Sequence, residues 1–192
     1  MTTKKELRAL CKERRKAINN KDEKSADIAR KILAMPEIKK ADKLFLFYPL
    51  EGEINLLPIA EYAWREGKSV GFPLCEDKDG IMTFRKVGSL DELVDGSFGT
   101  KEPRSEAEEI FPENAVIFLP ALAIDKNGYR LGYGKGYYDR YMSRYSGFSV
   151  VLCYSSELVG RLYRGRFDKP SSAIITERRI KTCKRSGKFG RA

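Results

Sequence analysis

AVIFLPALAIDKNGYRLGYGKGYYDRYM, residues 115–142, joins a short apolar run to a helix-forming segment through a loop rich in glycine. The run at 115–119 has the length and composition of a buried strand, and residues 136–145 have the pattern of a helix. A strand that leads through a loop into a helix is typical of α/β proteins, whose ligands bind beyond the carboxyl ends of the strands. The quoted stretch therefore predicts both the fold class and the place of a binding site.

The rest of the chain repeats this alternation of short apolar runs and helical segments. Thr3 and Glu6 form a capping-box pattern at the start of a basic helix. Strands that alternate with helices predict a mainly parallel sheet covered on both faces, that is, a three-layer α/β/α domain. Further helices are expected at 22–34 and 56–66, further strands at 43–48, 69–72, 81–84, 149–154 and 172–176, and a surface loop at 95–114.

The length of 192 residues suits one domain. We expect a single domain over residues 1–180, followed by a basic, mobile tail over residues 181–192. The longest apolar stretch, 115–124, is too short to span a bilayer and is broken by Pro120. Residues 1–16 lack the apolar core of a signal peptide. We therefore expect a cytoplasmic protein that does not enter a membrane.

The distribution of charge and the residue types present limit the kinds of catalytic and metal site that the chain can contain. Of the net charge of +10, residues 4–16 carry seven Lys or Arg against two Glu, and residues 181–192 carry five basic residues and no acid, so the part between them is neutral. The chain has no histidine, which excludes Ser-His-Asp and Cys-His catalytic groups and imidazole zinc sites. Its four cysteines are far apart and form no C-x-x-C pair, so we expect free thiols. Proton transfer then falls to carboxylate, lysine or tyrosine side chains, or to the substrate.

The glycine loop is the candidate site for a phosphate. Gly132, Gly134 and Gly136 match neither a dinucleotide fingerprint nor a Walker A loop, because Lys135 is followed by glycine. Bare backbone N–H groups, the start of a helix and the charge of Lys135 together suit an anion. The neighbouring tyrosines suit a heterocyclic base, and Asp139 suits Mg²⁺ bound to phosphate oxygens. We interpret the loop as a nucleoside triphosphate site; the alternative is a turn whose tyrosines pack in the core while its Lys and Asp face water.

Residues 118–142 closely resemble the signature of the 5-formyltetrahydrofolate cyclo-ligase family. Three other motifs of that family are similar to segments of this chain. Its amino-terminal K-x-x-L-R resembles residues 4–8, its strand and Glu-containing turn resemble FLFYPLEGEI (45–54), and its late Asp-x-Pro segment resembles FDKPSSAIITE (167–177). The four segments lie in the family's order, so the resemblance extends over nearly the whole chain.

The resemblance implies an ATP-dependent cyclo-ligase that uses ATP and Mg²⁺ to convert 5-formyltetrahydrofolate into 5,10-methenyltetrahydrofolate, with release of ADP and phosphate. In the implied mechanism the formyl oxygen attacks the γ-phosphate to give an imidate phosphate, and N10 then closes the ring as phosphate leaves. This suits a chain without histidine, because the substrate supplies both nucleophiles. The protein mainly positions them and stabilises charge.

The resemblance also implies roles for individual residues. The implied catalytic residues are Lys135 and Arg8, and the implied magnesium ligands are Asp139 and Asp168. The implied folate contacts are Tyr48, Glu53, Tyr133, Gly134, Lys135, Gly136 and Tyr137. The implied ATP contacts are Lys4, Lys5, Glu6, Leu7, Arg8, Arg130, Leu131, Gly132, Tyr133, Gly134, Lys135, Gly136, Tyr137 and Tyr138.

We expect small-molecule partners, no membrane or nucleic acid, and a monomer. A rival interpretation is a nucleic-acid-binding protein that uses its basic ends and clustered tyrosines. Against it, no known nucleic-acid module is visible and the middle of the chain is neutral. A second rival is a phosphate-sugar-binding α/β protein that does not use ATP. Lys4, Arg8 and Asp139 favour a triphosphate instead.

Overall fold

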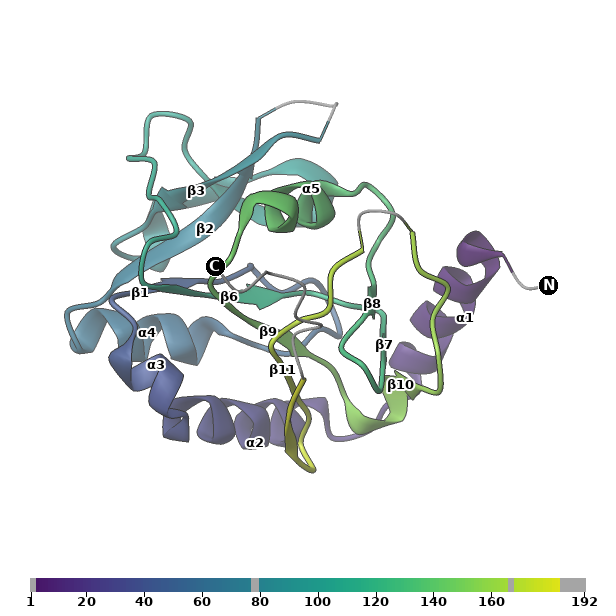
Figure 1. Ribbon diagram of the computed structural model, residues 1–192. Helices are drawn as coiled ribbons and strands as arrows, with labels where there is room; N and C mark the ends of the chain where they lie inside the picture. Colours follow the sequence, from purple (N-terminus) through teal and green to yellow (C-terminus); the bar gives the residue numbers. More distant parts are fainter. Residues whose placement is uncertain (1–2, 77–79, 166–167, 184–192) are drawn as a thin grey trace, which may run out of the picture.

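The computed structural model describes residues 3–76, 80–165 and 168–183 and is built around one large sheet (Figure 1). Residue 167 of the fourth motif and residues 184–192 of the expected tail lie outside the described residues. The inner strands pair in parallel, and the edge strands β12 and β3 are antiparallel to their neighbours, so the prediction of a mainly parallel sheet is confirmed. The order across the sheet is β12 (Ile180–Thr182), β11 (Ala173–Ile175), β9 (Phe148–Leu152), β6 (Ala115–Leu119), β1 (Lys43–Phe45), β2 (Ser69–Cys75) and β3 (Met82–Lys86).

Helices cover both faces of this sheet. The helices α2 (Lys21–Ala34), α3 (Pro36–Lys40) and α4 (Leu57–Arg65) lie on one face, and α5 (Tyr137–Arg144) lies on the other (Figure 1). Side chains alternate along each strand, so Leu44 of β1 packs into the core beneath α2 and α4, whereas Phe45 packs into the core that contains Met142 of α5. The predicted three-layer α/β/α architecture is confirmed.

The helix α1 (Lys4–Lys16) stands beside these layers, next to a small second sheet (Figure 1). The hydroxyl of Thr3 accepts from the N–H of Glu6 at 3.2 Å, and the Glu6 carboxylate accepts from the N–H of Thr3 at 2.7 Å, so the predicted capping box is confirmed. In the small sheet, β7 (Ala123–Asp125) and β8 (Arg130–Leu131) form a hairpin, and β10 (Leu158–Val159) pairs in parallel with β7. The sequence did not predict this sheet.

The segment expected to be a surface loop, 95–114, contains a strand. The strand β5 (Lys101–Pro103) pairs with β4 (Leu93–Asp95), and the side chain of Glu102 is buried. Most of the segment is exposed, as its composition of Gly, Pro and acids predicted, but Glu102, Pro103 and Ile110 are buried. Short 3₁₀ turns occur at η1 (Leu90–Glu92), η2 (Ser97–Gly99) and η3 (Ser155–Glu157).

The boundary expected at residue 181 falls inside β12. Lys181 pairs with β11, and Cys183 is buried against the sheet because β12 continues the chain along the edge. The folded unit thus extends at least to Cys183. No helix within the described residues has the length and apolar character that crossing a membrane requires.

Candidate functional site

The glycine loop follows the β7–β8 hairpin and leads directly into α5. Gly134 has a φ of +104° and Gly136 a φ of +78°, both in the left-handed region that residues with a side chain rarely adopt. Gly136 is the N-cap of α5, so the unpaired N–H groups of the first helical turn begin where the loop ends. Backbone donors and the charge of Lys135 therefore occupy the same short segment.

The helix α1 packs against this loop through Arg8. Its Nε donates to the carbonyl oxygen of Gly132 at 2.9 Å, and a Cβ atom added at Gly134 would lie 3.0 Å from the Arg8 guanidinium carbon. A side chain at position 134 would displace the arginine. Leu7 and Leu131 have a different role, since they pack with Tyr133 in a small apolar cluster behind the loop.

The start of α1 reaches the late Asp-x-Pro segment. The Nζ of Lys4 lies 3.3 Å from Oδ2 of Asp168, and the N–H of Gly165 donates to the same oxygen at 2.7 Å. Lys5 and Glu6 are exposed, and Glu6 is used by the cap of the helix. The first and the fourth motifs of the sequence therefore meet in space, and Lys4 is the residue of α1 that joins them.

Lys135 lies beside aromatic rings. It is exposed, and its Nζ is 5.2 Å from the ring centroid of Phe98, which in turn lies 6.1 Å from the ring centroid of Tyr137. Phe98 is 57 % exposed and has a left-handed φ of +63°. Sequence reasoning missed Phe98, although a lone aromatic residue in the glycine-flanked run DGSFG would have been a usable signal.

Arg130 and Asp139 form an ion pair across the loop. The Nη2 of Arg130 donates to Oδ1 of Asp139 at 2.6 Å, and the arginine side chain is only 4 % exposed. Both expected magnesium ligands, Asp139 and Asp168, are thus paired with an expected phosphate-binding cation, Arg130 or Lys4. The described residues contain no group of three or more His, Cys, Asp or Glu side chains that could hold a metal ion by themselves. Mg²⁺ would here need oxygens from a bound phosphate and water as well.

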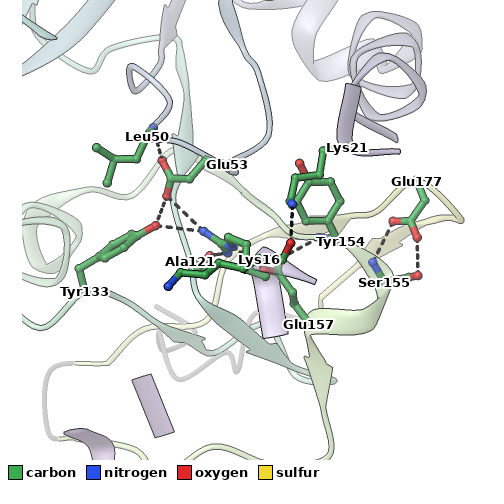
Figure 2. A network of polar contacts seen from close by, with 11 residues as sticks. Lys16, Lys21, Leu50, Glu53, Ala121, Tyr133, Tyr154, Ser155, Glu157 and Glu177 are labelled. Atoms are coloured by element: carbon green, nitrogen blue, oxygen red, sulfur yellow. Dashed lines mark hydrogen bonds and ion pairs between the residues drawn. The ribbon is translucent and has the colours of Figure 1, made fainter. Parts of the chain in front are cut away.

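The side chain of Glu53 is buried next to the hydroxyl of Tyr133, a residue of the loop (Figure 2). One carboxylate oxygen accepts from the hydroxyl of Tyr133 and is 3.5 Å from Nη1 of Arg15; the other accepts from the N–H of Leu50 at 2.9 Å. Burial raises the pKa of Glu53, while these hydrogen bonds and the charge of Arg15 oppose the rise. Both oxygens are already engaged, so a ligand N–H at Glu53 would share an oxygen with a protein donor.

Arg15 is a functional candidate that sequence reasoning missed. Seven basic residues lie within residues 4–16, and nothing in their composition distinguishes one that is buried. The signal was its spacing: it follows Cys11 by four positions and Arg8 by seven, which places all three on one face of the helix.

Tyr138 lies near a second buried carboxylate, that of Glu102, and Tyr48 contacts Thr100 of the same segment. Tyr48 packs partly buried against the main core, and its carbonyl oxygen accepts from Thr100 at 3.2 Å. Glu102 accepts from the N–H of Ser97 at 3.1 Å, and its charge, together with burial, raises the pKa of the Cys75 thiol to about 12. The hydroxyl of Tyr138 is buried and finds no hydrogen-bond partner among the described residues, and burial raises its pKa.

The loop residues Gly132 and Tyr133 connect two groups of these candidate residues, because Gly132 contacts Arg8 and Tyr133 contacts Glu53. The exposed Lys135 and the half-buried Arg8 supply cations at the glycine loop, and the exposed Lys4 lies on the same helix as Arg8, which suits a polyanion. Aromatic rings and the buried carboxylate of Glu53 lie on the side of Tyr133, which suits a heterocycle with N–H donors.

Comparison with known proteins shows what the chain is similar to. The model of the 5-formyltetrahydrofolate cyclo-ligase family matches residues 1–177. The 5-formyltetrahydrofolate cyclo-ligase of Escherichia coli (strain K12) is 26% identical over 179 residues, which cover 89% of this chain and 98% of that protein. The mouse protein of the same name is 28% identical over 166 residues, which cover 82% of each chain.

Two solved structures are similar over most of their length. The NMR structure of Aquifex aeolicus 5,10-methenyltetrahydrofolate synthetase has 32% sequence identity and a TM-score of 0.83, and covers 98% of this chain and 96% of that one. A 5,10-methenyltetrahydrofolate synthetase from Mycoplasma pneumoniae has the same fold with a TM-score of 0.73, at 20% identity over 91% of this chain and 98% of that one.

Proposed function

The chain belongs to the 5-formyltetrahydrofolate cyclo-ligase family and is an enzyme of folate metabolism, and from this premise we propose that it cyclises 5-formyltetrahydrofolate to 5,10-methenyltetrahydrofolate with ATP and Mg²⁺. The observation that carries the proposal is the contact between Arg8 and Gly132, which joins the first motif of the sequence to the glycine loop. Products are ADP and phosphate.

The phosphate side of the site supports ATP as the phosphoryl donor. Lys135 is exposed and forms no ion pair with a described residue, so its charge is available to a ligand. Arg8 is held by its Nε, which leaves its other N–H groups free to bind an anion. Fixed positive groups of this kind stabilise the charge that develops on a transferring phosphoryl group.

The donor set also fits Mg²⁺. Asp139 and Asp168 are oxygen ligands of the hard type that this ion prefers, and each lies beside a cation that phosphate oxygens can bind instead. Asp139 and Asp168 would hold the ion, which would neutralise charge on the phosphates. Release of Arg130 and Lys4 toward the phosphates would then accompany binding.

The folate side supplies both nucleophiles of the proposed reaction. The formyl oxygen attacks the γ-phosphate, the bond from that phosphorus to ADP breaks, and an imidate phosphate forms. N10 then attacks the formyl carbon and gives up its proton to solvent; the bond from that carbon to oxygen breaks, and phosphate leaves with the former formyl oxygen as the ring closes. Tyr48, Glu53 and Tyr133 would orient the folate, so that N10 approaches the activated carbon without a protein nucleophile.

A direct assay tests this function. Protein, ATP, Mg²⁺ and 5-formyltetrahydrofolate are mixed, and methenyl absorbance and ADP are followed together. We expect one ADP for each methenyl product. Cyclisation that proceeds unchanged without nucleotide would contradict the ligase assignment. We further propose that the enzyme acts as a monomer in the cytoplasm, and size-exclusion chromatography with light scattering tests the first part.

A further inference from the structure

Arg15 is a buried basic residue of α1, only 7 % exposed, and its guanidinium joins four distant parts of the chain. Its Nε donates to Glu157 at 2.6 Å, its Nη1 donates to the hydroxyl of Tyr133 at 3.0 Å, and its Nη2 donates to the carbonyl oxygen of Ala121. Nη1 also lies 3.5 Å from the carboxylate of Glu53. Figure 2 shows these partners gathered around one centre.

The partners of Arg15 fall into two groups. Glu157 and Ala121 belong to the scaffold, since Glu157 is fixed by the N–H of Tyr154 at 3.0 Å and Ala121 lies two residues after the end of β6. Tyr133 and Glu53 belong to the folate side of the proposed site. The guanidinium is planar and its N–H groups point in fixed directions. Glu157 and Ala121 therefore orient Arg15, and Arg15 in turn positions the hydroxyl of Tyr133 and the carboxylate of Glu53.

The charge of Arg15 also favours the ionised form of Glu53. Two buried carboxylates, those of Glu53 and Glu157, share this one guanidinium. Burial raises the pKa of both, and Arg15 is the charge that opposes this. Without it, the two acids would repel each other, and one would take up a proton. A protonated Glu53 would lose acceptor capacity toward the N–H groups of a pterin.

The same face of α1 supports the loop twice. Arg8 and Arg15 are seven residues apart, which is about 10 Å along an α-helix. Arg8 holds the carbonyl oxygen of Gly132, and Arg15 holds the hydroxyl of the next residue, Tyr133. Arg8 thus supports the part of the loop assigned to phosphate, and Arg15 supports the part assigned to the folate.

We propose that Arg15 is a positioning residue for the folate: it contacts neither substrate, and it sets the placement and the charge of Glu53 and Tyr133, which do. This inference rests on the proposed function for the identity of the ligand. It predicts that changes at Arg15 weaken folate binding and spare ATP binding, although α1 also carries the ATP-side residue Arg8.

The test uses two variants. Arg15→Lys keeps the positive charge but removes the planar set of guanidinium N–H donors, and Glu157→Gln removes the negative charge that holds Arg15 in place. The matched control is Arg14→Lys, the same change at the exposed neighbour on α1. Isothermal titration measures the Kd of 5-formyltetrahydrofolate and the Kd of MgATP for each folded variant. We expect Arg15→Lys to raise the folate Kd about tenfold or more and to leave the ATP Kd within about twofold, with the control like the parent.

A Tyr133→Phe background gives a second readout. If Arg15 acts through Tyr133, Arg15→Lys should change the folate Kd less in the Tyr133→Phe background, because phenylalanine has no hydroxyl for Arg15 to bind. Equal rises in both Kd values, or a lowered melting temperature with unchanged Kd values, would overturn the inference. If Arg15→Lys does not fold, Glu157→Gln must show the same selective rise.

The titration does not depend on turnover. A parent protein that binds 5-formyltetrahydrofolate but does not cyclise it overturns the proposed function and leaves this inference to be judged by the variants. A parent that does not bind the folate overturns both.

Discussion

Arg8 on the first helix donates from Nε to the carbonyl oxygen of Gly132 at 2.9 Å, across 124 positions of sequence. This bond attaches a basic helix in the first twenty residues to a loop that begins in the last third of the sequence. The helix brings Lys4 to Asp168 at its start and Arg15 to Tyr133 near its end. The site is therefore assembled by one helix that lies outside the layers of the sheet.

Lys135→Ala should cripple turnover. The variant removes the exposed charge inside the glycine loop, and loss of a group that stabilises phosphoryl transfer should raise the barrier by about 2–4 kcal/mol. Steady-state kinetics measure kcat/KM for ATP. The control is Lys40→Ala, an exposed lysine at the end of α3. Kinetics that match this control would show that Lys135 is only a surface charge.

Asp139→Asn should raise the Mg²⁺ requirement. Asn keeps the shape and one acceptor for Arg130 but loses the negative charge that attracts a hard cation. Activity is titrated with Mg²⁺ at saturating ATP, and the midpoint should move upward while excess Mg²⁺ partly restores the rate. Asp27→Asn is a matched control, because Asp27 is also paired with an arginine, Arg30, but lies on α2. Superimposable normalised curves would remove Asp139 from the metal site.

Arg140→Ala should weaken ATP binding without changing the folate Kd. Arg140 donates from Nη2 to the carbonyl oxygen of Lys135 at 2.7 Å and from Nε to that of Gly80 at 2.9 Å, so it holds the loop from outside. Loss of these bonds should cost about 1 kcal/mol of MgATP binding free energy. Arg144→Ala, one turn further along α5 and exposed, is the control. An unchanged ATP Kd would show that the loop holds its shape without this clamp.

Glu157→Gln should change how stability depends on pH. Burial raises the folded-state pKa of Glu157 above the ordinary value of 4.5, so the folded protein binds this proton more tightly than the unfolded chain. The stability that protonation contributes is present below pH 4.5 and is lost as pH rises through the folded pKa. Gln does not titrate, so it does not lose this contribution. As pH rises from 4.5 through the folded pKa of Glu157, the melting temperature of the variant minus that of the parent should therefore increase. A difference that stays constant from about pH 4 to pH 8 would contradict the shift.

Cys75 should alkylate slowly at neutral pH. Burial and the charge of Glu102 raise the thiol pKa to about 12, which keeps the thiolate scarce. Iodoacetamide labelling followed by mass spectrometry should show a rate that is still rising at about pH 10. Glu102→Gln should speed labelling, because the repelling charge is gone. Equal rates in parent and variant would mean that Glu102 does not influence the thiol.

The sequence by itself determined the fold class and the position of the loop. The runs at 115–119 and 149–154 became β6 and β9, and the helix after Gly136 became α5, because local periodicity and glycine conformation act over a few residues. The capping box of Thr3 and Glu6 is equally local. Where the contacts that stabilise an element lie within one helical turn or one strand, the local sequence pattern was sufficient to predict that element.

Only the tertiary structure decided which charges meet. Among the basic residues of α1, Arg15 is buried because Glu157, 142 positions later, lies opposite it, and no pattern in the helix records that distance. The burial of Glu102 likewise depends on a distant segment, since its carboxylate accepts from the N–H of Cys75, 27 positions earlier, at 3.4 Å. A charge enters the interior of a protein only with a partner, and the partner is selected by the packing of segments that are remote in sequence.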